Sequence, residues 1–225
     1  MKVEIRGDII PNDDKWIYDW LEMDATCPKD VKDLVDKANG EPLEVFINSG
    51  GGDVFSGVEI YDMLQRYSGK VTLHNIWAAS AASVILCAGR SDTTPAGMVM
   101  IHNVSGGARG DYHVMDKTSG VLQTADKAVA AAYAAKTGKS EQEILDLMDK
   151  ETWLTAQQAV DMGLIDEVYQ APIKMVASAG CSIPQEVIDK IRNTVPNPFK
   201  GNAGVDNKTL TQARLNFMKL KGVSN

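Results

Sequence analysis

The sequence predicts an α/β protein with a mainly parallel sheet, on the basis of three observations. Two apolar runs typical of strands, at residues 43–48 and 71–77, each lead through small residues into a stretch with helical spacing. Strands that alternate with helices of ten or more residues indicate right-handed crossovers and parallel neighbours. The length of 225 residues suits one domain with a real core and an appendage.

The elements of the first half follow one another regularly. Residues 2–9 are typical of a strand, and Pro11-Asn12-Asp13 starts a short helix. Pro28, which is tolerated in the first turn, starts a second helix that Gly40 ends. The half continues with a strand at 43–48, a helix at 54–67, a strand at 71–77 and an apolar helix that ends near Gly89.

The second half is expected to be mainly helical up to residue 170. A loop with Pro95 and Gly97 precedes a short apolar strand at 98–101, and a long helix is expected from about residue 114 to 137. Ser140, with Glu143 three residues on, has the pattern of a capping box for the next helix. The remaining elements are a helix at 156–162 with Thr155 as its N-cap and Gly163 as its stop, and then a final strand.

Charge divides the chain at about residue 170. The net charge is −7, but residues 171–225 hold eight basic and three acidic residues, a charge of +5 that leaves −12 for residues 1–170. We therefore expect a domain at 1–170 and a weakly structured basic C-terminal extension at 171–225, with two short amphipathic helices. The acidic balance argues against nucleic-acid binding.

The three cysteines suggest neither a metal site nor a disulfide framework. Cys27, Cys87 and Cys181 are odd in number and widely spaced, which suits a reducing compartment. The N-terminus lacks the apolar core of a signal peptide, and no run of about 18 apolar residues could span a membrane. We expect a cytoplasmic protein without a metal or cofactor.

Three glycines, Gly50 to Gly52, end the strand at 43–48 and are expected to form a turn. Exposed N–H groups in such a turn can stabilise a negative carbonyl oxygen, as in an oxyanion hole. The same turn could equally be a tight connection or an anion-binding nest. It is not a phosphate loop of the Lys-Ser/Thr type, because Asp53 stands where a lysine is needed.

Ser80 follows a strand and opens a helix, which is the place of a nucleophile, and the N–H of Ala81 would face an oxyanion formed there. Small residues around Ser80 could also serve close helix packing. Ser83 competes by composition, but one turn into the helix its hydroxyl is more often bonded to a carbonyl of the preceding turn.

The three histidines differ in their surroundings. His74 lies in the middle of a strand and His113 in a glycine-rich segment, where a packed and an exposed role are expected. His102 ends the strand at 98–101. Because Gly51, Ser80 and His102 end successive parallel strands, they are expected at one edge of the sheet, where crevices form.

Four segments in one order carry a family resemblance. They are INSGGG (47–52), AAS ending at Ser80 with Gly89 nine residues on, MIH (100–102) and ETWLTAQQAVDMGLID (151–166). Together, over about residues 3–170, they resemble the proteolytic subunit of the Clp protease. The AASAAS doublet and the basic extension are most similar to the Clp-like head-maturation (prohead) proteases of phages and prophages.

The resemblance implies a serine endopeptidase that acts through an acyl-enzyme, with a Clp protease/crotonase-like fold of repeated ββα units. It implies Ser80 as nucleophile, His102 as general base and Glu151 as the third member, where the family has an aspartate. Asp149 is the alternative third member. The resemblance also implies oxyanion N–H groups at Gly51 and Ala81 and substrate contacts at Gly52, Gly106 and Gly107.

The resemblance has implications for partners too. Residues 105–113 and the long helix after them occupy the place of the family's handle region. This implies a cyclic ring, which can be stacked in two layers. The family's pore-lining segment that meets the ATPase has no counterpart before the first strand, so we expect no ATPase partner. Capsid or scaffold proteins are the expected substrates, in the bacterial host cytoplasm or the prohead interior.

Two other functions fit parts of the pattern. A crotonase-type acyl-CoA enzyme shares the ββα units and paired oxyanion N–H groups, but it does not need Ser80 and His102 at these places. A catalytically impaired capsid-assembly protein of the same fold is favoured by Glu151 in place of aspartate. A Ser–Lys peptidase is disfavoured, because no lysine lies between Ser80 and His102.

Overall fold

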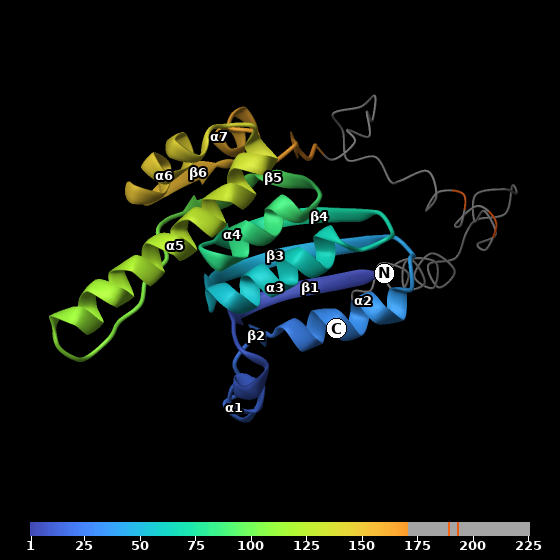
Figure 1. Cartoon of the computed structure of the whole chain (residues 1–225). Coiled ribbons are helices and arrows are strands. Elements are labelled where there is room, and N and C mark those ends of the chain that lie inside the picture. The colour runs from blue at the N-terminus through green and yellow to red at the C-terminus, as the bar shows by residue number, and fades with distance from the viewer. Residues whose placement is uncertain (171–188, 190–192, 194–225) are drawn as a thin grey trace, which may run out of the picture. The chain divides into compact units, whose positions relative to one another are not determined.

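The computed structural model describes residues 1–170, 189 and 193, and residues 1–170 lie in one compact unit (Figure 1). Apart from residues 189 and 193, the basic extension at 171–225, with its two predicted amphipathic helices and Cys181, lies outside the described residues. The division at residue 170 stays a prediction. The elements before the site are β1 (Lys2–Ile9), a 3-10 turn (Asn12–Asp14), α1 (Lys15–Trp20), β2 (Ala25–Thr26), α2 (Pro28–Ala38), β3 (Leu43–Gly52), α3 (Val54–Gln65) and β4 (Val71–Ala79). They are followed by α4 (Ala81–Ile85), a 3-10 turn (Leu86–Ala88), β5 (Arg90–Ile101), α5 (Tyr112–Thr137), α6 (Glu141–Asp149), β6 (Thr152–Thr155), α7 (Ala156–Asp161) and β7 (Glu167–Val168).

The strands of the described residues form one sheet in the order β2-β1-β3-β4-β5-β6, with β7 also paired to β5. Every pair is parallel except β5–β6, which is antiparallel. The predicted α/β class with a mainly parallel sheet is therefore confirmed. In this arrangement β3, β4 and β5 are neighbours, so their C-terminal ends meet at one edge.

One face of the sheet is covered by helices and carries the core (Figure 1). Alternate residues of β1, β3 and β4 point to this face and are fully buried, because successive strand side chains face opposite sides. Against them pack Ile60 and Leu64 of α3 and the small helix α4, whose residues are all buried. The strand residues of this core include Val3, Ile5, Val45, Ile47 and Leu73.

The opposite face of the central strands is polar. Glu4, Phe46, His74 and Asp92 lie side by side across β1, β3, β4 and β5. The His74 ring stacks on Phe46 with centroids 4.6 Å apart, and its Nε2 lies 2.6 Å from Glu44. Its Nδ1 lies 2.9 Å from Asp92. The sequence predicted a packed or sheet-edge role for His74, and in the structure its packed ring also links β3, β4 and β5.

The three glycines at residues 50–52 do not form the predicted turn. They continue β3, where Gly51 pairs with Asp8 and Gly52 with Ile9. Both have positive φ, and a Cβ on Gly52 would lie 2.2 Å from the carbonyl oxygen of Ile9, so the close approach of β1 requires a glycine. Asp53, not a lysine, caps α3 by accepting from the Ser56 N–H at 2.8 Å.

The predicted loop before residue 98 is also wrong, because β5 is one strand from Arg90 to Ile101. Asn75 pairs with Thr93 but Trp77 pairs with Met98, so residues 94–97 form an irregular bulge inside the strand. Pro95 and Gly97 lie in this bulge. Because the bulge residues do not pair with β4, the missing N–H of the proline costs the sheet no hydrogen bond. The sequence did not predict β6, which pairs with the C-terminal half of β5.

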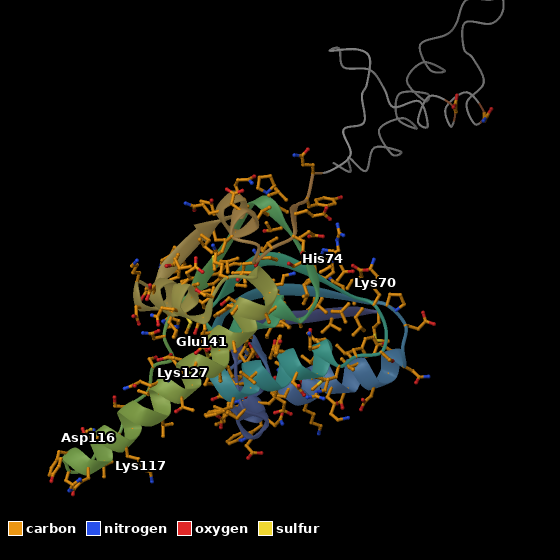
Figure 2. All side chains as sticks on the ribbon, turned by 45° about the horizontal axis from the view of Figure 1, so that its top comes forward. Lys70, His74, Asp116, Lys117, Lys127 and Glu141 are labelled. Atoms are coloured by element: carbon orange, nitrogen blue, oxygen red, sulfur yellow. The ribbon has the colours of Figure 1, made fainter. Side chains whose placement is uncertain are left out.

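The predicted long helix is present as α5. It begins at Tyr112, two residues before the expected start, and Asp111 is its N-cap. Only Val129, Ala130 and Tyr133 of its 26 residues are buried. The N-terminal half, which carries Asp116 and Lys117, extends away from the sheet (Figure 2). The predicted capping box at Ser140–Glu143 is present. The predicted N-cap Thr155 is present too, and it forms a capping box with Gln158 that the sequence did not predict.

None of the described helices is long and apolar enough to cross a membrane. Within the described residues there is also no cluster of three or more side chains suited to a metal ion.

Candidate active site

Ser80 lies at a sharp turn between β4 and α4. Its backbone has φ 55° and ψ −128°, outside the regions that a non-glycine residue normally adopts. The Ser80 N–H donates to the carbonyl of Met100 on β5 at 3.0 Å, which fixes the turn against the neighbouring strand. Such strained strand-to-helix turns expose a nucleophilic side chain above the edge of a sheet.

The structure brings Ser80 and His102 together. Ser80 Oγ lies 2.7 Å from Nε2 of His102, which follows the last residue of β5. A histidine with its proton on Nδ1 accepts the serine hydroxyl in this geometry and can remove its proton. The parallel pairing of β4 and β5 is what places the two residues, 22 apart in the chain, at one edge.

Ser83, the competing serine, is fully buried. Its hydroxyl donates to the Ser80 carbonyl at 2.7 Å, and the Tyr133 hydroxyl on α5 lies 2.7 Å from the same oxygen. Because the Ser83 hydrogen is given to the Ser80 carbonyl, the Tyr133 hydroxyl is the donor to Ser83. Burial raises the pKa of Tyr133, which keeps this donor protonated. Ser83 therefore connects the Ser80 turn to α5 and does not face solvent.

The two predicted oxyanion donors differ. Gly51 lies tightly against the Ser80 turn, because a Cβ there would come within 2.7 Å of both the Ser80 Cβ and the Ala79 carbonyl oxygen. Its N–H, however, donates to Ser49 Oγ at 3.1 Å, and this hydrogen bond would have to break before the N–H could stabilise an oxyanion. Ala81 opens α4, and its N–H belongs to the unpaired first turn of the helix. Ala81 also lines the cavity in front of Ser80.

The two candidate third members do not contact His102. In the part of the chain that the structure describes, the His102 ring makes one hydrogen bond, to Ser80. The Glu151 carboxylate accepts from Trp153 Nε1 at 3.2 Å, and Asp149 accepts from the Asn103 amide at 2.7 Å. The antiparallel register nevertheless pairs Ile101 with Thr152, so the next step beyond it would bring Glu151 opposite His102.

A cavity of about 350 Å³ opens in front of Ser80 and His102. The predicted substrate residues Gly52, Gly106 and Gly107 line it. The sequence did not predict its other wall, an apolar surface of α5, although helical spacing of apolar residues in 114–137 is the signal that could have shown it. The residues of that wall are Thr118, Val121, Leu122, Ala125, Val129 and Tyr133.

The fold and the paired serine and histidine define an α/β protein arranged for nucleophilic chemistry by a serine. A family profile described as "Clp protease" matches residues 30–172. The chain therefore belongs to the Clp protease family.

Three relatives share the name "ATP-dependent Clp protease proteolytic subunit". Those of Bacteroides fragilis strains NCTC 9343 and YCH46 are 38% identical over 133 residues, and that of Bacteroides thetaiotaomicron VPI-5482 is 35% identical over the same length. The match covers 57% of this chain, and the chain spans 60–64% of the length of these relatives.

Proposed function

We propose that this protein is a serine endopeptidase that hydrolyses peptide bonds through an acyl-enzyme. The observation that carries the proposal is the 2.7 Å contact between Ser80 Oγ and His102 Nε2 at the mouth of the cavity. Ser80 attacks the scissile carbonyl while His102 takes its proton, and the Ala81 N–H stabilises the oxyanion. His102 then protonates the leaving amine, and water releases the acyl group by the same steps in reverse.

The third member of the site is proposed to be Glu151, with Asp149 as the alternative. The β5–β6 register supports Glu151, because one further step of the pairing would bring this residue opposite His102, and its carboxylate would then have to leave Trp153. A carboxylate on Nδ1 would hold the imidazole in the tautomer that accepts from Ser80 and would stabilise the imidazolium.

The cavity supports a preference for an apolar residue before the scissile bond. Its interior is formed by Val84, Val104 and the apolar side chains of α5, and among the described residues Asp53 is the one carboxylate that lines it, with no lysine or arginine. An apolar side chain gains free energy by leaving water for such a surface.

The proposal is tested by labelling with a fluorophosphonate and by cleavage of casein and of short peptides. We expect the label on Ser80, and we expect Ser80→Ala to lose both labelling and cleavage. Ser105→Ala, at a second serine lining the same cavity, is the matched control and should still be labelled at Ser80. Full cleavage by Ser80→Ala would exclude this nucleophile.

Finer points extend the proposal. We propose that the substrates are phage capsid or scaffold proteins, supported by the AASAAS doublet and the basic residues 171–225. We also propose cleavage without an ATPase partner, which the exposed rim at Ser105, Gly106 and Gly107 favours, since a peptide can reach the cavity directly. Cleavage of an unfolded capsid protein in the absence of ATP tests both points.

A cyclic ring is the proposed assembly. The N-terminal half of α5 projects from the rest of residues 1–170 (Figure 1). It carries exposed apolar side chains, including Tyr112, Val114 and Met115. Clustered apolar side chains on one projecting element are typical of a contact surface.

One observation favours a second function. Because neither Glu151 nor Asp149 contacts His102, an assembly protein with impaired catalysis is the alternative. It predicts rings without labelling of Ser80.

A further inference from the structure

The segment between β5 and α5 carries His102 and the cavity rim but has almost no main-chain hydrogen bonds. Among the residues that the structure describes, the main chain of 103–110 makes one, from the Val104 N–H to Oδ1 of Asp126, at 2.7 Å. Bonds of this kind, with a charged acceptor, are shorter and stronger than those between neutral groups. The position of this segment therefore depends strongly on a single carboxylate.

Asp126 lies on α5, one helical turn after Leu122, so the two side chains share a face of the helix. Leu122 faces the same segment, because a Cβ on Gly106 would lie 3.4 Å from Leu122 Cδ2. The segment thus runs along α5, with Asp126 bound at Val104 and Leu122 packed near Gly106.

This arrangement joins the two walls of the cavity. Val104, Ser105, Gly106 and Gly107 form one wall, and the apolar face of α5 forms the other. The Asp126–Val104 bond is the one polar link between these walls in the described structure, and it lies two residues from His102. This hydrogen bond therefore fixes the width of the cavity, and it also contributes to the position of His102.

We propose that Asp126 is a positioning residue for substrate: it holds the segment after His102 against α5 at the spacing that an apolar substrate side chain needs. This inference rests on the proposed peptidase function. Asp126 does not touch the reacting atoms, so its removal should weaken substrate binding more than it slows the chemistry at Ser80. His102 itself is held from the other side, because β5 is paired up to Ile101.

The experiment compares Asp126→Ala with Asp126→Asn and with Asp116→Ala in the full chain. Asp116 lies on the exposed part of the same helix and makes no hydrogen bond or ion pair among the described residues (Figure 2). For a peptide with an apolar residue before the scissile bond, we expect Asp126→Ala to raise KM about tenfold, with little change in kcat or in the labelling of Ser80. Asp126→Asn keeps an acceptor oxygen and should recover most of the loss, while Asp116→Ala should behave as the wild type.

Hydrogen exchange of residues 103–110 provides a readout independent of catalysis. Asp126→Ala should exchange faster there and unchanged in β1 and β3, whereas Asp116→Ala should not differ from wild type. A wild-type KM together with wild-type exchange in Asp126→Ala would overturn the proposal, as would an equal fall of kcat and labelling with KM unchanged. If the wild type itself is not labelled at Ser80, the peptidase function fails, and unchanged exchange in Asp126→Ala would then also remove the role of Asp126.

Discussion

At Ser80 the backbone conformation is imposed by its surroundings. A non-glycine residue at φ 55° costs about 1–3 kcal/mol, and the turn is kept by the bond to Met100 and by the glycine that lies against it. The site therefore depends on residues that never touch a substrate.

Gly51→Ala tests this dependence. The added Cβ would lie 2.7 Å from Ser80 Cβ, at a residue whose φ is 95°, so strain and a clash with backbone act together. We expect a loss of about 2 kcal/mol or more in the free energy of unfolding and loss of labelling at Ser80, measured by denaturant titration and mass spectrometry. Gly120→Ala, in open space on α5, is the control and should be neutral or slightly stabilising; an unchanged Gly51→Ala would contradict the account.

Two substitutions that keep the side-chain shape and remove the charge can decide whether Glu151 or Asp149 is the carboxylate that acts with Ser80 and His102. Glu151→Gln is expected to lower kcat about a hundredfold or more, because the imidazolium loses its stabilising carboxylate. Asp149→Asn should lower kcat less than tenfold, since its bond with Asn103 does not reach the imidazole. The reverse order of effects would assign the role to Asp149, and no effect from either would leave a serine–histidine pair without a carboxylate.

Among the elements, β4 carries His74 near its middle and leads directly into Ser80, the proposed nucleophile. Burial pushes the pKa of His74 down, but hydrogen bonds to Asp92 and Glu44 outweigh it and raise the pKa above its ordinary value. Both ring nitrogens face carboxylates, an arrangement that the imidazolium satisfies and the neutral ring cannot.

His74→Asn should therefore destabilise the fold in a pH-dependent way. Because the folded pKa is raised, the contribution of His74 is fully present below about pH 6.5, its ordinary value, and is lost as pH rises through the folded pKa. We expect a difference from wild type on the order of 1 kcal/mol at pH 6, discounted for partial exposure, and a smaller one at pH 9. Thermal unfolding across this range measures it, with His113→Asn on exposed α5 as control; a difference that grows with pH would refute it.

At the scale of elements, the sequence predicted the features that depend on local residue patterns, such as helix starts. It missed the features that depend on pairing between distant strands. The starts of α2, α6 and α7 followed from proline and capping side chains, which act within a few residues. Gly50–Gly52 look like a turn, and only the pairing of β3 with β1 makes them a strand. The bulge at 94–97 and the antiparallel β6 likewise depend on partners distant in the chain.

The candidate site shows the same division. The spacing of strands and helices predicted that Ser80 and His102 meet, because each ends a neighbouring parallel strand. Whether Glu151 reaches His102 is decided by side-chain rotamers around Trp153 and by the left-handed backbone of Glu151, which a sequence does not reveal.

At the scale of the whole molecule, the proposed ring depends on contacts made by α5. We expect rings by light scattering after size-exclusion chromatography. Met115→Glu should break them, because it places a charge in an apolar contact, while leaving the circular dichroism unchanged. Lys117→Glu, also on the exposed half of the helix (Figure 2), is the control and should still assemble; a monomeric wild type would exclude the ring.

The wall of the cavity that α5 forms bears on which residues of this protein can change during evolution without loss of the fold. Thr118, Val121, Leu122 and Ala125 shape the space in front of Ser80, yet the buried residues of the helix begin only at Val129. Substitutions at these four positions leave the core filled, so most should change stability by about 0.5 kcal/mol or less. Under the proposed function, cleavage preference can therefore change from one lineage to another while the fold and Ser80 stay the same, and a library confined to these positions would sample new specificities in the laboratory.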